Sequence, residues 1–167
     1  MKDIAYNKTA EQFLEQLPKG AFLTVQSDDR LNTMTIGWGS LGIAWRKPVL
    51  MVMVRYSRFT HELLENAADF TVSVPLDTAM KPALSTAGSK SGRDINKFET
   101  ANLTAQPSKI VQSPVINECD LFYECKIIYQ QSMDPAEMPS EIKETFYGDD
   151  DLHVMYFGEI VASYTKE

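Results

Sequence analysis

The chain has 167 residues and a formal net charge of −7, with 44% hydrophobic and 23% charged residues. This composition is ordinary for a globular protein and excludes collagen, a coiled coil and a wholly disordered chain. The length predicts a single domain over residues 1–167. The longest wholly apolar run, 49–54, is too short to cross a bilayer, and the polar start begins no secretory signal, so we expect a cytoplasmic protein that binds no membrane.

The negative charge is concentrated in one segment. Between Asp134 and Asp151, seven acidic residues accompany one basic residue, Lys143, so this segment carries a charge of −6, whereas the first 133 residues are neutral overall. The acidic balance argues against nucleic-acid binding. Two basic stretches, 46–61 and 78–98, remain in the neutral part. They form either a site for a small anion or ordinary surface charge.

The two cysteines, Cys119 and Cys125, are six residues apart in a segment that is predicted to be a strand. An extended strand would separate them by roughly 20 Å, well beyond the ~7 Å limit for a disulfide. The sequence contains no CxxC motif and no paired Cys/His spacing, so we expect two thiols and no metal site.

The first half of the chain is predicted to hold one helix, a set of strands and a second helix. Thr9 and Gln12 have the form of a capping box, and the helix that they begin ends at Pro18. The second helix, 60–67, has Thr60 in position to cap it. β-branched and aromatic residues predict strands over 21–26, 33–40, 49–55 and 70–74.

The second half is predicted to contain two further helices and three strands. The helices are 77–85, whose middle Pro82 weakens, and 93–100. Residues 133–151 hold two prolines and many acids and are interpreted as an acidic insertion loop. The strands are expected over 103–105, 121–131 and 153–164. Seven strands with few helices favour a closed or partly closed barrel.

Two stretches offer a site for an anion, and the first of them suits a phosphate monoester. In Val54-Arg55-Tyr56-Ser57-Arg58-Phe59-Thr60, a strand ends and a helix begins, so backbone N–H groups, hydroxyls and guanidiniums converge; the alternative is a capped helix with surface arginines. Residues 87–98 combine hydroxyls, glycines and cations, and form either an anion-binding turn or a flexible surface loop. Neither GxGxxG nor GxxxxGK[ST] occurs, so a Rossmann domain or a P-loop would lack its phosphate cradle.

A third stretch, 32–40, contains two glycines within a predicted strand. Such glycines mark either a bulge in a barrel strand or a place where a flat ligand comes close. Met34, Ile36 and Trp38 share one face of this strand and would form an apolar wall.

Together, these stretches resemble the flavin reductase-like, FMN-binding split-barrel family, in particular its flavoredoxin-like branch. The resemblance covers about residues 10–165 and rests on their order and spacing, together with Tyr156-Phe157-Gly158-Glu159-Ile160 near the end. It implies a mainly β fold, a six-stranded Greek-key antiparallel barrel with flanking helices, and a homodimer with FMN near the subunit boundary.

The resemblance also implies which residues hold FMN. The isoalloxazine would be lined by Met34, Thr35, Ile36 and Trp38, and Asn32 in the same stretch is a further cofactor-binding residue. The phosphate and ribityl chain would be held by Arg55, Ser57, Arg58 and Thr60. The site would be closed by Ser89, Lys90, Ser91 and Lys97.

A histidine is the candidate catalytic residue. Many members of the family carry a Gly-Asp-His turn before the last strand, where the histidine places the nicotinamide. Here additional residues separate Gly148 from His153, so His153 matches the family histidine only after an insertion. It is either that catalytic residue or a half-exposed strand histidine.

The leading hypothesis from the sequence is NAD(P)H-dependent flavin reduction, in which hydride passes from the nicotinamide to FMN. An alternative is an FMN electron carrier that a redox partner protein reduces after docking on the acidic segment 134–151. A third is a split barrel that binds pyridoxal phosphate or haem. The choice between NADH and NADPH and the final electron acceptor are left open by the sequence.

Overall fold

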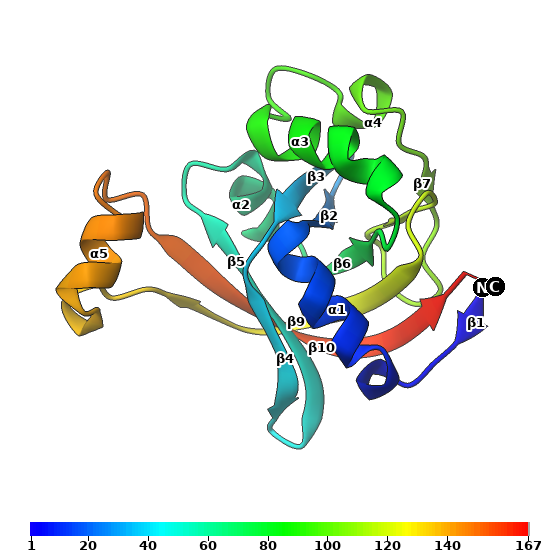
Figure 1. The fold of residues 1–167 in the computed structure, drawn as a ribbon, viewed down its shortest axis with the longest axis horizontal. Helices are drawn as coiled ribbons and strands as arrows, with labels where there is room; N and C mark the ends of the chain where they lie inside the picture. Colours follow the sequence, from blue (N-terminus) through cyan, green and yellow to red (C-terminus); the bar gives the residue numbers. More distant parts are fainter. Residues whose placement is uncertain (167) are drawn as a thin grey trace.

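The computed structural model describes residues 1–166 and consists mainly of one antiparallel sheet with helices around it (Figure 1). The long strands are β2 (Ala21–Ser27), β3 (Arg30–Ile36), β4 (Gly39–Ala44), β5 (Lys47–Arg55), β6 (Asp69–Val74), β9 (Leu121–Ser132) and β10 (His153–Thr165). Their order in the sheet is β3-β2-β6-β9-β10-β5-β4. The predicted mainly β, split-barrel fold is confirmed, because the sheet coils around an apolar core without β3 pairing to β4 among the described strands.

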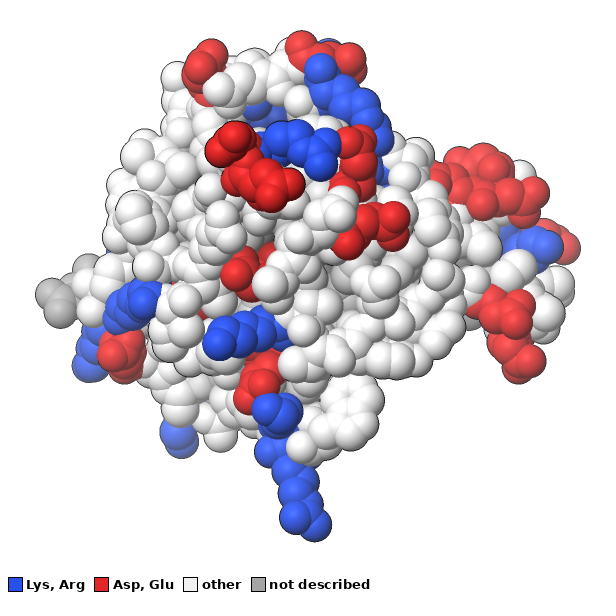
Figure 2. All heavy atoms as spheres, turned by 180° about the vertical axis from the view of Figure 1, so that it is seen from behind, with Lys and Arg blue, Asp and Glu red and all other residues white. Residues whose placement is uncertain are grey.

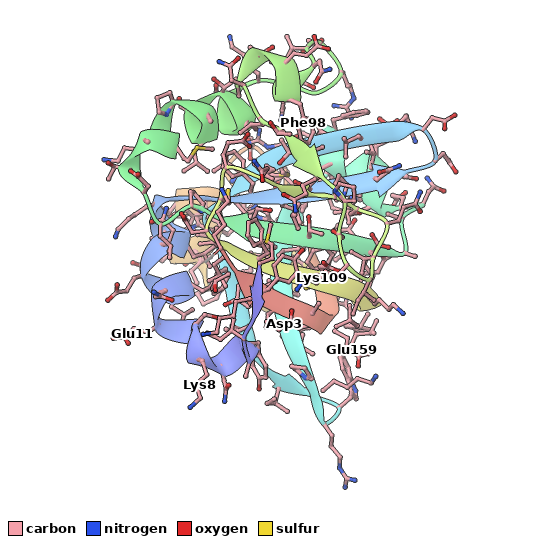
Figure 3. All side chains as sticks on the ribbon, turned by 90° about the vertical axis from the view of Figure 1, so that its right-hand side faces the viewer. Asp3, Lys8, Glu11, Phe98, Lys109 and Glu159 are labelled. Carbon is pink, nitrogen blue, oxygen red and sulfur yellow. The ribbon has the colours of Figure 1, made fainter. Side chains whose placement is uncertain are left out.

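Short strands complete the sheet and its surroundings. β1 (Lys2–Asp3) pairs with β10, so that the barrel sheet has eight strands, and β7 (Ala105–Gln106) pairs with β8 (Val115–Ile116) in a separate ribbon. The Lys109 ammonium contacts Asp3 and lies 4.4 Å from the centre of the Tyr164 ring, which fastens β1 beside the end of β10 (Figure 3). Residues 2–3 and 164–165, near the two ends of the chain, therefore lie side by side (Figure 1).

The strands bury apolar residues on both of their faces. Because neighbouring residues of a strand point to opposite sides, Leu23 and Tyr123 lie in the core inside the barrel, whereas Phe22 and Phe122 lie in a second core outside it. All four side chains are fully buried. The outer core is covered by α3 (Lys81–Ser89), which thereby fixes this helix and the loop that follows it against the sheet.

Three of the predicted helices form with different ends. α1 (Ala10–Gln16) is present, but the predicted capping box is wrong, since the Thr9 hydroxyl donates to the Tyr6 carbonyl oxygen and bonds the Tyr123 hydroxyl instead. α2 (Phe59–Leu64) begins before Thr60, which is buried inside the helix rather than capping it. Pro82 lies in the first turn of α3, where its missing N–H costs no helical bond, so it does not interrupt the helix.

Two further expectations need correction. Residues 93–100 supply only the short α4 (Lys97–Thr100), which the Asn96 side chain caps. The predicted strand 33–40 is divided at Gly37 and Trp38 into the end of β3 and the start of β4. At Gly39 a Cβ would lie 2.7 Å from the Met51 carbonyl oxygen, so a glycine is needed where β4 turns to pair with β5.

The acidic segment 133–152, here called the acidic arm, projects from the barrel on the ends of β9 and β10 (Figure 1). The prediction of a loop is wrong, because the arm contains η4 (Pro135–Glu137) and α5 (Ser140–Phe146). The Asp134 carboxylate accepts the Ala136 N–H and starts η4. Seen from behind, acidic atoms gather on the projecting part of the molecule (Figure 2). Among residues 1–166, no helix has the length and hydropathy needed to span a bilayer.

Candidate functional site

Two adjoining cavities open where β3, β5, the start of α2 and the loop after α3 meet. The larger, about 260 Å³, is lined mainly by charged and hydroxyl side chains and is here called the polar cavity. The smaller, about 160 Å³, lies against the indole and is called the Trp38 cavity. Met34, Arg55 and Arg58 line both of them. The two cavities therefore form one continuous site with a polar and an aromatic end.

All of the residues that the sequence singled out line this site. Those at the polar cavity are Asn32, Met34, Arg55, Ser57, Arg58, Thr60, Ser89, Lys90, Ser91 and Lys97. Those at the Trp38 cavity are Met34, Thr35, Ile36, Trp38, Arg55, Arg58 and His153. The structure thus brings together three stretches that are far apart in the sequence.

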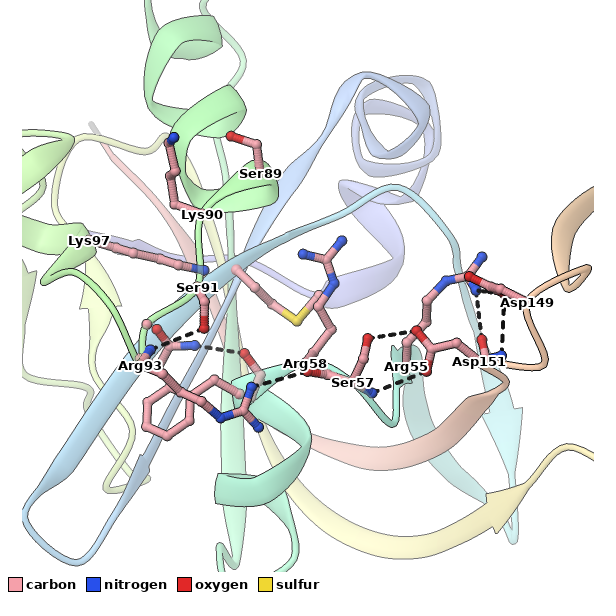
Figure 4. Close-up of a pocket in the computed structure, with 15 residues that line it drawn as sticks. Arg55, Ser57, Arg58, Ser89, Lys90, Ser91, Arg93, Lys97, Asp149 and Asp151 are labelled. Atoms are coloured by element: carbon pink, nitrogen blue, oxygen red, sulfur yellow. Dashed lines mark hydrogen bonds and ion pairs between the residues drawn. The ribbon is translucent and has the colours of Figure 1, made fainter.

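Two cations dominate the polar cavity. Lys97 is 4% exposed, and its ammonium donates to the Ala87 carbonyl oxygen at 2.8 Å. Arg58 donates to the Gly88 carbonyl oxygen, also at 2.8 Å. Burial, and next the nearby Arg58 charge, lower the pKa of Lys97 to about 8. Within residues 1–166 no carboxylate forms an ion pair with either cation, so an anion entering the cavity would be stabilised by both (Figure 4).

The acidic arm reaches into the same cavity, which the sequence did not indicate. The Asp151 carboxylate accepts the backbone N–H of Ser57 at 3.1 Å and its hydroxyl at 2.6 Å (Figure 4). Arg55 donates to the Asp151 carbonyl oxygen at 2.6 Å and lies 3.6 Å from the Asp149 carboxylate. Both acids were counted only as part of a charged insertion, because nothing in the local pattern shows that they fold back onto β5.

A third arginine lies at the rim of the polar cavity and was not among the predicted site residues. Arg93 donates to the Ser57 carbonyl oxygen at 3.1 Å, and its guanidinium lies 5.4 Å from the centre of the Phe59 ring. The preceding Gly92 packs closely on β3, since a Cβ there would lie 2.2 Å from the Asn32 side-chain oxygen. Gly92 and Arg93 both lie in the predicted anion-binding turn 87–98, and this turn is the feature of the sequence from which Arg93 could have been predicted as a site residue.

Several of the predicted residues already have partners. The Asn32 amide donates to the Thr60 hydroxyl at 2.8 Å, and both side chains are buried, so this pair ties β3 to α2 beneath the cavity. The Ser89 hydroxyl donates to the Ser85 carbonyl oxygen, and the Ser91 hydroxyl accepts the Arg93 N–H. Lys90 is exposed at the mouth.

The Trp38 cavity has an apolar wall and one histidine. Met34 and Ile36 are buried, whereas Trp38 is 43% exposed. Thr35 lines the same cavity, and its hydroxyl donates to the Leu84 carbonyl oxygen at 2.6 Å. Met53 completes the wall and was not among the predicted residues. It is two residues from Arg55 in β5, so the two side chains lie on the same face of the strand.

His153 begins β10, directly opposite Arg55 of β5. Its ring lies 5.5 Å from the Trp38 ring, and its Nδ1 bonds the Tyr147 hydroxyl at 2.7 Å. Burial, and next the charge of Arg55, lower the pKa of His153 to about 4, so the imidazole is neutral at pH 7. The alternative of a half-exposed strand histidine is wrong, because the residue is 8% exposed.

A model of the flavin reductase-like domain family matches residues 16–167. The chain belongs to this family. Among curated relatives, an uncharacterized protein of Archaeoglobus fulgidus is 31% identical over 144 residues, which are 86% of this chain and 71% of that protein. The uncharacterized protein YddH of Escherichia coli is 26% identical over 125 residues, 74% of this chain and 62% of its own length, so the chain spans less than two thirds of that relative.

Solved structures share the fold of this family member. The flavoredoxin of Desulfovibrio vulgaris (Miyazaki F) superimposes with a TM-score of 0.70 and 23% identity over 89% of this chain and 69% of that one. An FMN-binding protein of Thermus thermophilus with bound p-hydroxybenzaldehyde superimposes with a TM-score of 0.69 and 21% identity, over 88% of this chain and 71% of that one. A Streptomyces globisporus NADH:FAD oxidoreductase in complex with NAD and FAD fragments superimposes with a TM-score of 0.67 and 17% identity, over 88% of this chain and 74% of that one. These similarities establish the split-barrel fold.

Proposed function

We propose that the chain binds FMN, with its phosphate in the polar cavity and its ring in the Trp38 cavity. The observation that carries this proposal is the cation pair Arg58 and Lys97, which has no carboxylate partner among residues 1–166. The pair lies in a continuous site whose other end has an apolar wall. A phosphate needs charge-assisted donors, and a flat ring needs an apolar wall. Membership of the flavin reductase-like family supports the same ligand.

Each part of the site would then have a distinct role. Arg58 and Lys97 neutralise the phosphate, the hydroxyls of Ser57, Ser89 and Ser91 contact the phosphate and ribityl chain, and Lys90 closes the mouth. Asn32 and Thr60 support this arrangement from below through their hydrogen bond. Met34, Ile36 and Trp38 form the wall on which the ring stacks.

We propose further that the chain is an NAD(P)H-dependent flavin reductase. FMN supplies the hydride-accepting chemistry, and the protein orients the two rings and excludes water between them. No side-chain acid or base is required for hydride transfer. The neutral His153, held at Nδ1 by Tyr147, faces the Trp38 cavity and would position the nicotinamide by a hydrogen bond rather than by charge.

The first test is binding and reduction by the purified protein. We expect FMN to bind more tightly than riboflavin, and its visible spectrum to bleach when NADH or NADPH is added without oxygen. A protein that neither retains nor rebinds FMN would contradict the proposal. An absorption spectrum typical of pyridoxal phosphate or haem would favour the third hypothesis instead.

A second candidate function is an FMN electron carrier, and the projecting acidic arm favours it (Figure 2). An arm with a charge of −6 would steer a basic redox partner, and such steering weakens as salt rises. Reduction by a partner protein that slows with ionic strength, together with no oxidation of NAD(P)H by the chain alone, would select this candidate. Steady NAD(P)H oxidation by the chain alone would exclude it.

The remaining expectations belong to the same proposal. We propose a single domain that acts in the cytoplasm, and we propose a homodimer, which the family resemblance implies. Sedimentation of the FMN-loaded protein measures the oligomeric state directly, and limited proteolysis measures whether the acidic arm is cut before the barrel.

A further inference from the structure

A third cavity lies on the far side of Trp38, between β5 and the acidic arm. It has a volume of about 480 Å³ and is here called the methionine pocket. Its walls are formed by Trp38, Met53, Met133, Met138, Ile142, Phe146 and Tyr147. None of these side chains is charged. Ile142 and Phe146, four residues apart on α5, turn the same helix face toward the pocket and remain 45% exposed.

The pocket offers few polar groups to a ligand. Its side chains carry only the Trp38 indole N–H and the Tyr147 hydroxyl, and that hydroxyl already bonds His153 Nδ1 at 2.7 Å and the Met133 sulfur at 3.3 Å. A charged molecule would therefore lose its hydration without gaining an ion pair. Thioether and aromatic side chains instead adapt to flat apolar molecules.

The methionine pocket continues into the site already described. Trp38 and Met53 line both this pocket and the Trp38 cavity, so the indole is the wall between them. The Trp38 ring meets the Phe146 ring edge-to-face at 5.2 Å on one side and lies 5.5 Å from His153 on the other. A molecule in the methionine pocket would lie one aromatic ring away from the cavity assigned to the flavin ring.

We propose that the methionine pocket binds a flat, uncharged molecule of the quinone class, and that this molecule is the electron acceptor of the site. The binding itself needs no flavin; only the acceptor role rests on the proposed function. In the overall reaction NAD(P)H and a proton would become NAD(P)⁺, and the quinone would take up the corresponding two electrons and two protons to become the hydroquinone. The acidic arm therefore supplies the wall of an acceptor site.

The two tryptophans allow a direct test. Trp45 lies at the β4–β5 turn, 5.7 Å from the Tyr129 ring, and is not part of the pocket. Replacing it in the variant Trp45→Phe leaves Trp38 as the only indole of the chain. Titration of the flavin-free variant with 2-methyl-1,4-naphthoquinone should quench the Trp38 fluorescence along a saturable curve. A purely linear, collisional quench would overturn the proposal.

The matched controls introduce a charge into the pocket, outside the pocket or on the quinone. In the Trp45→Phe background, Ile142→Lys should weaken naphthoquinone binding by about tenfold or more, because it places an ammonium at the apolar wall. Ile110→Lys, at another exposed isoleucine that lies outside the pocket, should leave the affinity unchanged. The charged analogue 1,4-naphthoquinone-2-sulfonate should bind more weakly than the neutral quinone. Equal binding of the two quinones would overturn the assigned ligand class.

The test also separates this proposal from other outcomes. If a second copy of the chain covers the pocket, Ile142→Lys will convert a dimer to a monomer in sedimentation and the parent protein will show no saturable quench, which overturns the proposal. If the protein binds FMN but shows no saturable quenching by the quinone, only the proposal for the methionine pocket is contradicted. If the quinone quenches along a saturable curve but the protein fails to bind FMN, only the proposed flavin function is contradicted.

Discussion

The carboxylate of Asp151 accepts both the backbone N–H and the hydroxyl of Ser57, at 3.1 and 2.6 Å. These residues are 94 positions apart, and the contact joins the acidic arm to the end of β5. The Asp151 carboxylate thus accepts two hydrogen bonds that the proposed FMN phosphate would otherwise accept. The arm and the ligand are therefore competitors at Ser57, while Arg58 and Lys97 remain free of carboxylates among residues 1–166.

Asp151→Asn is expected to tighten FMN binding. The substitution removes one negative charge from the polar cavity and weakens the internal competitor, which should contribute about 1 kcal/mol, or roughly fivefold in the dissociation constant. Fluorescence titration with FMN measures the change. Riboflavin is the control ligand, since it has no phosphate and its affinity should stay the same. Weaker FMN binding by the variant would show that Asp151 supports the site rather than competing with its ligand.

Arg58→Ala is expected to weaken FMN binding by about 2 kcal/mol, roughly thirtyfold, because a charge-assisted contact to the phosphate is lost. Riboflavin binding should change little. Lys47→Ala is the matched control, since Lys47 is a cation that pairs with Glu159 far from the cavity. Equal losses for FMN and riboflavin would remove Arg58 from the phosphate site.

FMN binding is expected to weaken as the pH rises through about 8. The pKa of Lys97 is lowered to about 8 by burial and by Arg58, so the ammonium is charged below this pH and loses its proton above it. A phosphate binds the charged form better, and binding should raise the pKa of Lys97 in turn. Dissociation constants measured between about pH 7 and 9 test this. Lys97→Met should bind more weakly and lose the pH dependence; an unchanged slope in this variant would contradict the assignment.

The lowered pKa of His153 predicts a pH-dependent stability. An unfolded chain protonates this histidine near its usual pKa of 6.5, whereas the folded protein does so only at about 4. The unfolded state therefore binds more protons between these values, and the free energy of unfolding should fall as the pH drops from 6.5 toward 4, by up to about 3 kcal/mol.

Urea unfolding of the parent protein and of His153→Gln measures this effect. The parent should lose stability between about pH 6.5 and 5, before most carboxylates titrate, and the variant should lose less. Identical slopes would mean that His153 titrates normally in the folded protein. Tyr147→Phe adds a readout of the hydrogen bond itself, because the chemical shift of His153 Nδ1 should move when the hydroxyl is removed.

The sequence by itself determined the strands, the class of fold and most of the residues around the site. Runs of β-branched and aromatic residues predict β2, β5, β6, β9 and β10. In β2 and β6 both faces of the strand are buried, so the enrichment in these residue types, rather than an alternation of apolar and polar residues, was the signal. The residues from 32–38, 55–60 and 89–97 were assigned through the family resemblance, because each stretch taken alone also had an ordinary structural interpretation. The structure places all three stretches around the same two adjoining cavities.

Only the tertiary structure decided what the acidic arm does. Its helix α5 was missed because the two prolines and many acids of this segment indicated a loop. The contact that packs the helix is the one between Phe146 and Trp38, which is about a hundred residues away in the sequence. The pairing of β5 with β10 sets His153 opposite Arg55 and brings Asp151 to Ser57. Long-range strand register creates these contacts, and no local periodicity encodes it.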